Sequence, residues 1–446
     1  MSCYAFESAN KNAYVTIRHH ELSPSCLFLS DGGDPFEELM KRAAEMSEEN
    51  KSGASAREKF EVPNGIGFGS LAWGDVDRGF MPTRSSFYQG VSTTSGLNSM
   101  DSFDVNDLED AYLTLLRGGI SFADTCESYG AKMRNRKLSS EHLIGRIRSS
   151  CLGREKGIGQ PILSNKFVPK LMSRSFDAFD VRAGSDAVLR ACRASADRME
   201  VGVIDLYQLS APTYLYAGGR TALIAGLAGC VQSGLCRRVG VSNMNAKKVQ
   251  HFYDRLRDDH GIRLATNQVS LSLVNRKVIF DGTVDYCEKM GVTVVAHTPL
   301  AGGLASGLYT EANPTGGDRT ARLDKFNMKD LRKFAPIHEA LDVVCDMCDR
   351  RVKKELRAKM KQAKDLAERN PRKFQKPKDK VINDVTPAQV SINWVRAKGA
   401  VPIPGIKNKQ DANELLDCLR FELTDDEVAM LDRAADIVDG YRRRYP

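Results

Sequence analysis

The chain has 446 residues, of which 42% are hydrophobic, and no run approaches the ~18 to 20 uninterrupted apolar residues of a membrane-spanning helix. Its 11 cysteines are odd in number and scattered, which excludes a disulfide scaffold and predicts reduced thiols in an intracellular compartment. The net charge of +8 does not indicate a nucleic-acid-binding protein. Between Arg350 and Lys380, 14 Lys and Arg stand against 4 Asp and Glu, and the rest of the chain is slightly acidic.

Residues 1–60 show no strong hydrophobic period and end in a charged stretch of small residues, so we expect a partly disordered N-terminal extension. The extension lacks the basic segment and apolar core of a secretory signal. Its acidic residues do not favour an organelle presequence, and the sequence leaves both a cytoplasmic and a plastid location open.

From Gly65 onward, short β-branched runs alternate with helical patterns, which is typical of βαβ units and a parallel sheet. The eight predicted strands are Ile66–Leu71, Ile120–Asp124, Pro161–Phe167, Val203–Leu209, Arg238–Ser242, Thr266–Leu271, Val292–His297 and Val401–Pro404. Predicted helices between them include Ser140–Ser149, Asp186–Met199, Ala246–Asp258 and Asp281–Lys289.

Eight such units fit either a closed barrel or an open doubly wound sheet. The open sheet would carry GxGxxG at the start of its first helix, whereas Gly65, Gly67 and Gly69 precede a stretch with no helical period. Polar residues recur just after the strands instead, as they do at the C-terminal mouth of a barrel. We therefore predict an α/β protein, a (β/α)8 TIM barrel over residues 61–440.

Two segments interrupt the repeat and should project from the barrel. One is a Ser/Gly/Thr-rich loop from Gly79 to Ser102, and the other is a basic helical insertion over about residues 324–384, before the last unit. The insertion holds a CxxC pair, Cys345 and Cys348. With no second pair or suitably spaced His to complete a tetrahedral set, we expect two thiols on a polar helix and no metal site.

Three residues at the ends of the second and third predicted strands form a candidate catalytic group: Asp124, Tyr129 and Lys166. A phenol has a free pKa of about 10, and a nearby ammonium lowers that pKa by favouring the phenolate. A carboxylate paired with the ammonium would fix its position. The spacing alone also fits a tyrosine that caps a turn beside a surface ion pair.

Several ordered blocks resemble the aldo-keto reductase superfamily. They are FADTCESYG, LSSEHLIGR, SNKF, VIDLYQL, RRVGVSNMN, NQVSLSL, VTVVAHTPLAGGL, TPAQVSINWV and VPIPGIKNKQDANELL. The plant plastid and cyanobacterial branch of NADP-dependent oxidoreductases is the most similar, through AWGD in Gly67–Asp75 and PGIKN in Pro404–Asn408. The resemblance covers roughly residues 62–436. It implies NADPH-dependent reduction of an aldehyde or ketone to an alcohol by hydride transfer, with Tyr129 as general acid and no metal.

The family's fourth catalytic residue is a His directly after the DLYQL strand, and this chain has Ser210 there. A hydroxyl can donate a hydrogen bond but cannot carry a proton charge near pH 7. We therefore expect altered activity, with a restricted substrate range or low turnover. The alternative is a catalytically weakened regulatory or redox-sensing subunit that holds NADP(H).

The resemblance also implies a cofactor site. Ser242, Asn243 and Gln268 would contact the nicotinamide amide and His297 would stack on its ring, although Ser-Asn after a strand is more often a helix N-cap. The remaining residues assigned to the cofactor are Thr298, Pro299, Leu300, Gly302, Pro404, Gly405, Lys407, Asn408, Gln410 and Glu414. The last four stand in the final strand-to-helix loop, where barrels often bind phosphate, which favours NADPH over NADH.

Two assignments concern partners. Trp73 and Asp75 follow the first predicted strand and would line the pocket for a small carbonyl substrate, although a packing Trp fits nearly as well. The basic insertion reads as a solvated helix face or as a contact for an anionic partner, and its lack of interleaved aromatic residues gives no indication of base stacking.

Overall fold

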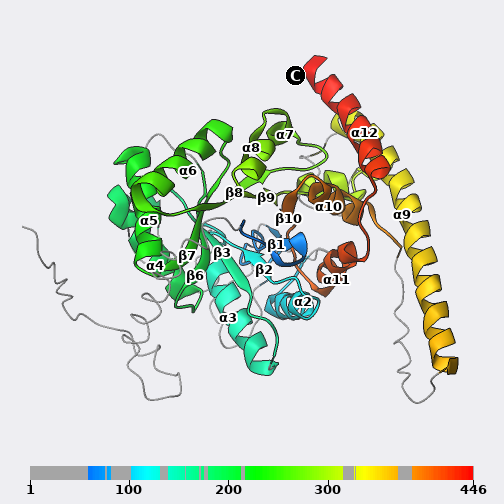
Figure 1. The fold of residues 1–446 in the computed structure, drawn as a ribbon, viewed down its shortest axis with the longest axis horizontal. Helices are drawn as coiled ribbons and strands as arrows, with labels where there is room; N and C mark the ends of the chain where they lie inside the picture. Colours follow the sequence, from blue (N-terminus) through cyan, green and yellow to red (C-terminus); the bar gives the residue numbers. More distant parts are fainter. Residues whose placement is uncertain are drawn as a thin grey trace, which may run out of the picture.

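Eight parallel strands form one sheet at the centre of the molecule, with helices around it (Figure 1). The computed structural model describes residues 59–75, 78–81, 102–130, 139–155, 157–169, 172–174, 179–211, 216–314, 326, 328–369 and 384–444. The strands, in their order around the sheet, are β1 (Gly67–Gly69), β2 (Phe122–Asp124), β3 (Ile162–Phe167), β6 (Ile204–Leu209), β7 (Cys236–Ser242), β8 (Leu264–Ser270), β9 (Thr293–His297) and β10 (Ala400–Ile403). All eight coincide with predicted strands.

The first and last strands meet and close the sheet. The Gly69 amide donates to the Pro404 carbonyl at 2.8 Å, and Gly69 forms a parallel bridge with Gly405. A Cβ on Gly69 would stand 3.3 Å from the Ile403 carbonyl oxygen, so a glycine suits this close approach. The (β/α)8 barrel is confirmed, and the open doubly wound sheet is excluded.

The helices lie outside the barrel, mostly between successive strands (Figure 1). They are α2 (Val105–Arg117), α3 (Ser140–Arg154), α4 (Gly184–Arg198), α5 (Gly219–Gln232), α6 (Ala246–His260), α7 (Lys277–Phe280), α8 (Thr283–Lys289), α9 (Met328–Arg369), α10 (Pro387–Ala397), α11 (Lys409–Asp417) and α12 (Asp425–Arg444). Local sequence sets their ends. Asp104 and Asp107 form a capping box at α2, and α6 runs from an Asn245 cap to the left-handed Gly261.

On β2, β6 and β9, the side chains that point into the barrel change from apolar to polar toward the C-terminal end of the strand. Phe122, Leu206 and Val295 belong to one buried cluster, together with Phe60 and Val62 from the start of the described chain. Since side chains alternate between the two faces of a strand, the residue two positions later points the same way. Those residues are Asp124, Gln208 and His297. The barrel is therefore packed with apolar groups toward one end and presents polar groups at the C-terminal mouth.

Two short strands escaped prediction, β4 (Met172–Arg174) and β5 (Phe179–Val181), which pair antiparallel outside the barrel. Residues 1–58 of the predicted N-terminal extension and most of the Gly79 to Ser102 loop lie outside the described residues, whereas Phe60, at the end of the extension, is buried. Among the helices that the structure describes, none is both long and apolar enough to cross a bilayer.

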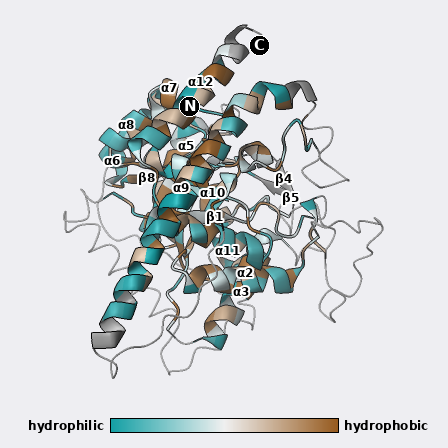
Figure 2. Cartoon of the chain, turned by 90° about the vertical axis from the view of Figure 1, so that its right-hand side faces the viewer, coloured by the Kyte–Doolittle hydropathy of each residue, from teal (hydrophilic) through white to brown (hydrophobic). Residues whose placement is uncertain are grey.

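The basic insertion contributes α9, which extends past the barrel (Figure 1), and its outer half is strongly hydrophilic (Figure 2). Its inner half packs against α12 and α10. Cys345 and Cys348 are buried there, in the main hydrophobic core. The expectation of two thiols on a polar helix was wrong in this respect, because the helix turns an apolar face toward the core at the CxxC pair. Burial raises the pKa of both thiols to about 12.

Candidate active site

The predicted catalytic residues come from neighbouring strands that end at the same mouth. Asp124 is the last residue of β2, Lys166 is the second-last residue of β3, and Ser210 follows β6. The strands pair in parallel in this order, with Asp124 opposite Ser164 and Lys166 opposite Gln208. Their C-terminal ends are therefore adjacent, which brings the side chains of Asp124 and Lys166 together.

Asp124 and Lys166 form a buried ion pair between Oδ2 and Nζ, with both side chains at most 4% exposed. Three further donors surround Oδ1 of Asp124. Ser164 Oγ lies at 2.9 Å, Gln268 Nε2 at 2.8 Å and Gln208 Nε2 at 3.5 Å. Burial opposes the ammonium form of Lys166, but Asp124 and Tyr129 outweigh it and hold the pKa above its ordinary value. A carboxylate held by so many donors stays in place and keeps the ammonium charged.

Tyr129 lies on the turn after β2, where its amide donates to the Cys126 carbonyl at 3.0 Å. The ammonium nitrogen of Lys166 is 5.2 Å from the centroid of its ring. Burial raises the pKa of Tyr129 to about 12, and the nearby Lys166 charge offsets only part of that rise. The ammonium lowers the pKa as expected, but desolvation of the phenolate outweighs this effect, so the net pKa is raised. At neutral pH the phenol holds its proton.

Ser210, Asn243 and His297 are linked across the mouth. Asn243 Nδ2 donates to the Ser210 carbonyl at 3.3 Å, and Asn243 Oδ1 lies 3.0 Å from Nε2 of His297. An amide oxygen only accepts, so Nε2 of His297 carries the proton. Burial, reinforced by the charge of Lys166, lowers the pKa of His297. A neutral imidazole at the end of β9 and an exposed amide after β7 therefore stand at the same mouth of the barrel as the Asp124–Lys166 ion pair.

Ser242 and Gln268 connect the predicted cofactor residues to the Asp124 carboxylate. The Ser242 hydroxyl donates to the Gln268 carbonyl at 2.8 Å, and the side-chain amide of Gln268 points at Asp124. Both residues are about 2% exposed. Gln268 thus reaches the ion pair directly, a contact that the sequence did not indicate.

The turn after β9 has an unusual backbone. Thr298 and Ala301 in this turn are non-glycine residues with φ of 54° and 51°, and Asn243, after β7, has φ of 58°. Positive φ is rare for such residues, above all for a β-branched one, and such strain is concentrated at functional sites. Of the other residues predicted in this turn, Pro299 is buried, Leu300 is half-buried and Gly302 is exposed, with φ of 69°. The strain marks the loop where the cofactor residues were predicted.

A second group lies beside β10 and the start of α11. Asn408 caps α11 by accepting from the Asp411 amide at 3.0 Å, and the Lys407 ammonium lies 5.6 Å from the ring centroid of Phe103.

The other residues predicted for the cofactor in this group make different contacts. Glu414 accepts from the Thr386 hydroxyl at 2.7 Å, while Gln410 is exposed. Pro404 and Gly405 form the closing seam with Gly69. A half-buried cation at a helix N-terminus suits a phosphate, whereas Asn408 and Glu414 make contacts within the protein.

The two residues predicted for the substrate pocket differ in placement. Trp73 is fully buried, stacks near Phe68 and donates from Nε1 to the Ile406 carbonyl at 2.8 Å. A buried, hydrogen-bonded ring cannot line an open pocket, so its environment corresponds to the packing alternative. Asp75 is half-buried and pairs with Arg78 at 3.2 Å.

The sequence reasoning missed four polar residues at the site. Ser164 and Gln208 donate to Asp124, as described above. Glu127 and Arg182 form a buried ion pair beside the Tyr129 turn. The inward alternation on β3 and β6 could have identified Ser164 and Gln208, because each is two residues from another inward residue on its strand. No local pattern marks Arg182, whose partner is 55 residues away.

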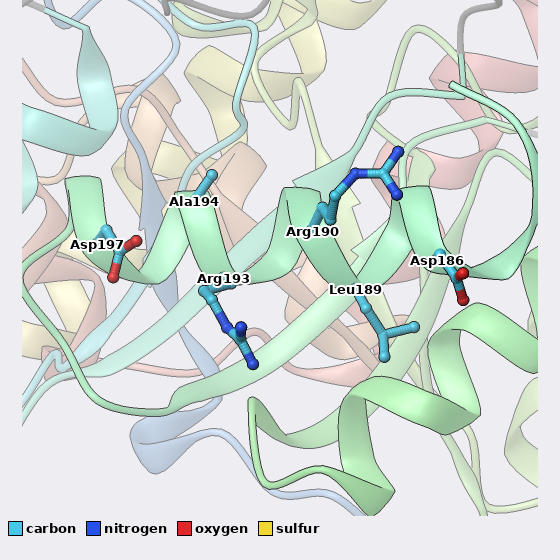
Figure 3. A pocket seen from close by; sticks show the side chains of 6 residues that line it. All are labelled: Asp186, Leu189, Arg190, Arg193, Ala194 and Asp197. Atoms are coloured by element: carbon cyan, nitrogen blue, oxygen red, sulfur yellow. The ribbon is translucent and has the colours of Figure 1, made fainter. Parts of the chain in front are cut away.

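A surface hollow of about 490 Å³ lies elsewhere, on the outer side of α4 (Figure 3). Its lining residues all belong to that helix: Asp186, Leu189, Arg190, Arg193, Ala194 and Asp197. None of the predicted site residues lines it. The hollow is therefore separate from the mouth where the predicted catalytic residues meet.

Comparison with known proteins identifies the family. The model of the aldo/keto reductase family matches residues 90–436. A chloroplastic pyridoxal reductase of Arabidopsis thaliana is 27% identical over 372 residues, 83% of this chain and 82% of the relative. The aldo-keto reductase yakc [NADP(+)] of Schizosaccharomyces pombe is 23% identical over 356 residues, 79% of this chain and 89% of the relative.

A solved structure supports the same fold. The aldo-keto reductase of Klebsiella pneumoniae in complex with NADPH is 20% identical and has a TM-score of 0.50 over 83% of this chain and 90% of that chain. The family predicted from the ordered sequence blocks is thus confirmed. This chain belongs to the aldo/keto reductase family of oxidoreductases.

Proposed function

We propose that the protein reduces the carbonyl group of a small aldehyde or ketone to an alcohol, with NADPH as hydride donor and Tyr129 as general acid. One observation carries the proposal. A protonated phenol lies 5.2 Å, measured from its ring centroid, from a buried ammonium that is itself paired with Asp124. Few arrangements suit proton donation to a developing alkoxide better than a neutral acid beside a fixed positive charge.

Each residue of the group has a distinct task. Tyr129 holds a proton at neutral pH and gives it to the carbonyl oxygen of the substrate. Lys166 then stabilises the phenolate that remains, since opposite charges attract more strongly where water is excluded. Asp124 keeps Lys166 charged and in place. Ser210 donates a hydrogen bond to the substrate oxygen, but it cannot supply a proton as the family's His would.

NADPH, when bound, supplies the hydride that reaches the carbonyl carbon. The residues present fit such a group. The exposed Asn243 amide and the neutral His297 ring suit an amide-bearing aromatic ring, and Lys407 at the start of α11 suits a 2′-phosphate. The names of two similar proteins include NADP(+) or NADPH, which agrees with this chemistry.

The test is an assay of purified protein with NADPH and a panel of aldehydes and ketones, followed by NADPH absorbance. The panel includes pyridoxal, because a similar protein is named for that aldehyde. Substrate-dependent oxidation of NADPH supports the proposal. NADPH binding without oxidation for any member of the panel would contradict the proposal. It would favour the alternative, a regulatory or redox-sensing subunit, which the replacement of the family's His by Ser210 leaves open.

We also propose that the outer half of α9 contacts an anionic partner. Arg350, Lys354, Arg357, Lys361 and Lys364 are all exposed and follow one another at alternating spacings of four and three residues. Side chains at these spacings lie along one helix face. Binding to heparin that weakens with salt, and that is lost when Lys354, Arg357 and Lys361 are replaced by Gln, would support a partner. Salt-independent binding would contradict it.

For localisation, we propose a plastid or the cytoplasm, on the basis of the chloroplastic relative. A fusion of the full chain to a fluorescent protein, viewed in plant cells, distinguishes the two compartments. Fluorescence confined to the secretory pathway would contradict both.

A further inference from the structure

An ion pair outside the catalytic group lies directly behind the Tyr129 turn. The carboxylate of Glu127 and the guanidinium of Arg182 meet at two points, Nη1 to Oε1 at 2.5 Å and Nη2 to Oε2 at 2.8 Å. The two side chains are 6% and 3% exposed. Burying two charges costs about as much free energy as their attraction returns, so such a pair is a weak source of stability. Its contacts indicate another role.

The pair connects the segments that carry the acid and the ammonium. Glu127 begins the turn that holds Tyr129, and its Oε1 also accepts from the Val168 amide at 2.5 Å. Arg182 donates from Nη1 to the Val168 carbonyl at 3.0 Å. Val168 stands two residues after Lys166. The ion pair therefore binds the turn that carries Tyr129 to the end of the strand that carries Lys166, through the backbone amide and the backbone carbonyl of Val168.

Arg182 also contacts Phe167, the residue between Lys166 and Val168. Its guanidinium carbon lies 4.9 Å from the ring centroid of Phe167, and the Phe167 carbonyl accepts from the Ser210 amide at 2.9 Å. The backbone of Ser210 is therefore hydrogen-bonded to the segment that links Lys166 to Val168. One buried guanidinium thus borders the segments of three of the four catalytic positions.

The other side of the turn is held by backbone contacts. The Ser140 amide donates to the Tyr129 carbonyl at 3.2 Å. Gly130 has φ of +70°, and a Cβ there would stand 2.9 Å from the Trp73 carbonyl oxygen. The tight packing fixes the end of the turn, while Glu127 anchors its beginning together with the Cys126 thiol, which donates to the Lys166 carbonyl at 3.6 Å.

We propose that Glu127 and Arg182 are positioning residues, which set the separation between the Tyr129 phenol and the Lys166 ammonium. The proposal rests on the proposed role of Tyr129 as general acid. A displacement of about 1 Å in a catalytic group can lower the rate by roughly 10²-fold. Loss of the pair should therefore lower kcat while leaving the cofactor contacts at Asn243, His297 and Lys407 intact.

The test uses the full chain with Glu127→Gln and Arg182→Met combined, so that no buried charge is left without its partner. The matched control is Glu427→Gln with Arg351→Met. In that pair, the Arg351 guanidinium also makes two contacts with the Glu427 carboxylate, at 2.5 and 3.0 Å, and donates to the backbone carbonyl of Glu422. This pair joins α9 to α12 instead. We expect kcat to fall roughly 10- to 100-fold in the first variant and to stay unchanged in the control, with the Kd for NADPH unchanged in both.

Chemical rescue separates positioning from a general loss of structure. In an Arg182→Gly variant, added guanidinium ion should restore part of kcat, whereas kcat of Arg351→Gly should not respond. If the Glu127→Gln/Arg182→Met variant does not fold, Arg182→Lys keeps the charge and loses the second contact to Glu127. It should fold and show a lower kcat with unchanged NADPH binding.

Amide hydrogen exchange supplies a readout that needs no turnover. Residues 126–130 and 167–168 should exchange faster in the Glu127→Gln/Arg182→Met variant than in the wild type or the control. A wild type that oxidises no NADPH would overturn the proposed function while this exchange still tests the positioning role. A folded variant with wild-type exchange in both segments and wild-type kcat would overturn the positioning role itself.

Discussion

Replacing Tyr129 by Phe removes one oxygen atom and leaves the ring in place. Asp124 keeps its contacts with Lys166, Ser164 and Gln268, so the buried ion pair should survive the substitution. The loss should therefore fall on the chemical step. General acid catalysis contributes about 10²- to 10⁴-fold, and at about 1.36 kcal/mol per decade this is an increase of roughly 2.7 to 5.4 kcal/mol in the barrier.

The assay compares kcat for aldehyde reduction and the Kd for NADPH in the wild type and the Tyr129→Phe variant. We expect a large fall in kcat and little change in Kd. Tyr207→Phe is the matched control, since it removes a phenol oxygen from a fully buried side chain of β6 in the hydrophobic core. A Tyr129→Phe variant with the kcat of the wild type would refute the acid assignment, whatever the control does.

Burial raises the pKa of Tyr129 to about 12, so kcat for reduction should stay level between about pH 6 and 9, because the acid remains protonated. Alcohol oxidation needs the phenolate, so its kcat should rise with pH. A fall in kcat for reduction near neutral pH would contradict this prediction. Ser210→His should raise kcat by up to about 10²-fold by restoring a group that carries a proton, and an unchanged kcat in this variant would show that the hydroxyl does not limit turnover. Lys407→Ala should weaken NADPH binding by about 1.5 to 3 kcal/mol, or roughly 10- to 100-fold in Kd, and leave NADH binding unchanged. A fluorescence titration measures both, and equal weakening for the two cofactors would contradict the assignment of Lys407 to the 2′-phosphate. Tyr207→Phe should raise the free energy of unfolding, measured by urea denaturation, by up to about 1 to 3 kcal/mol. The reason is that the Tyr207 hydroxyl has no hydrogen-bond partner among the residues that the structure describes. A lower free energy of unfolding in the variant would show that the hydroxyl does have a partner.

The sequence predicted the barrel well because alternating β-branched and helical runs are a local signal. All eight barrel strands were found, while β4 and β5 were not, since three-residue strands are too short to show a period. The closure between Gly69 and Pro404 could be expected from the fold class but not from either segment, because the contact depends on the whole ring of strands.

The candidate site was predicted in part. The position of each residue after its strand brought Asp124, Tyr129 and Lys166 to one mouth. The net pKa of Tyr129 was not predictable, because it depends on how much water the surrounding residues exclude. The burial of Trp73 was equally hidden, since one Trp after a strand can face the mouth or the helices. Arg182 lies in an irregular stretch, and only the folded chain brings it to Glu127.

The closing seam of the barrel has a consequence for synthesis of the chain. Trp73 donates to a carbonyl 333 positions later, beside the seam where β1 meets β10. Until the last strand leaves the ribosome, β1 presents an open sheet edge, and such edges promote association between chains. A nascent chain that stalls before residue 400 should therefore need chaperones, and truncation before β10 should give insoluble protein.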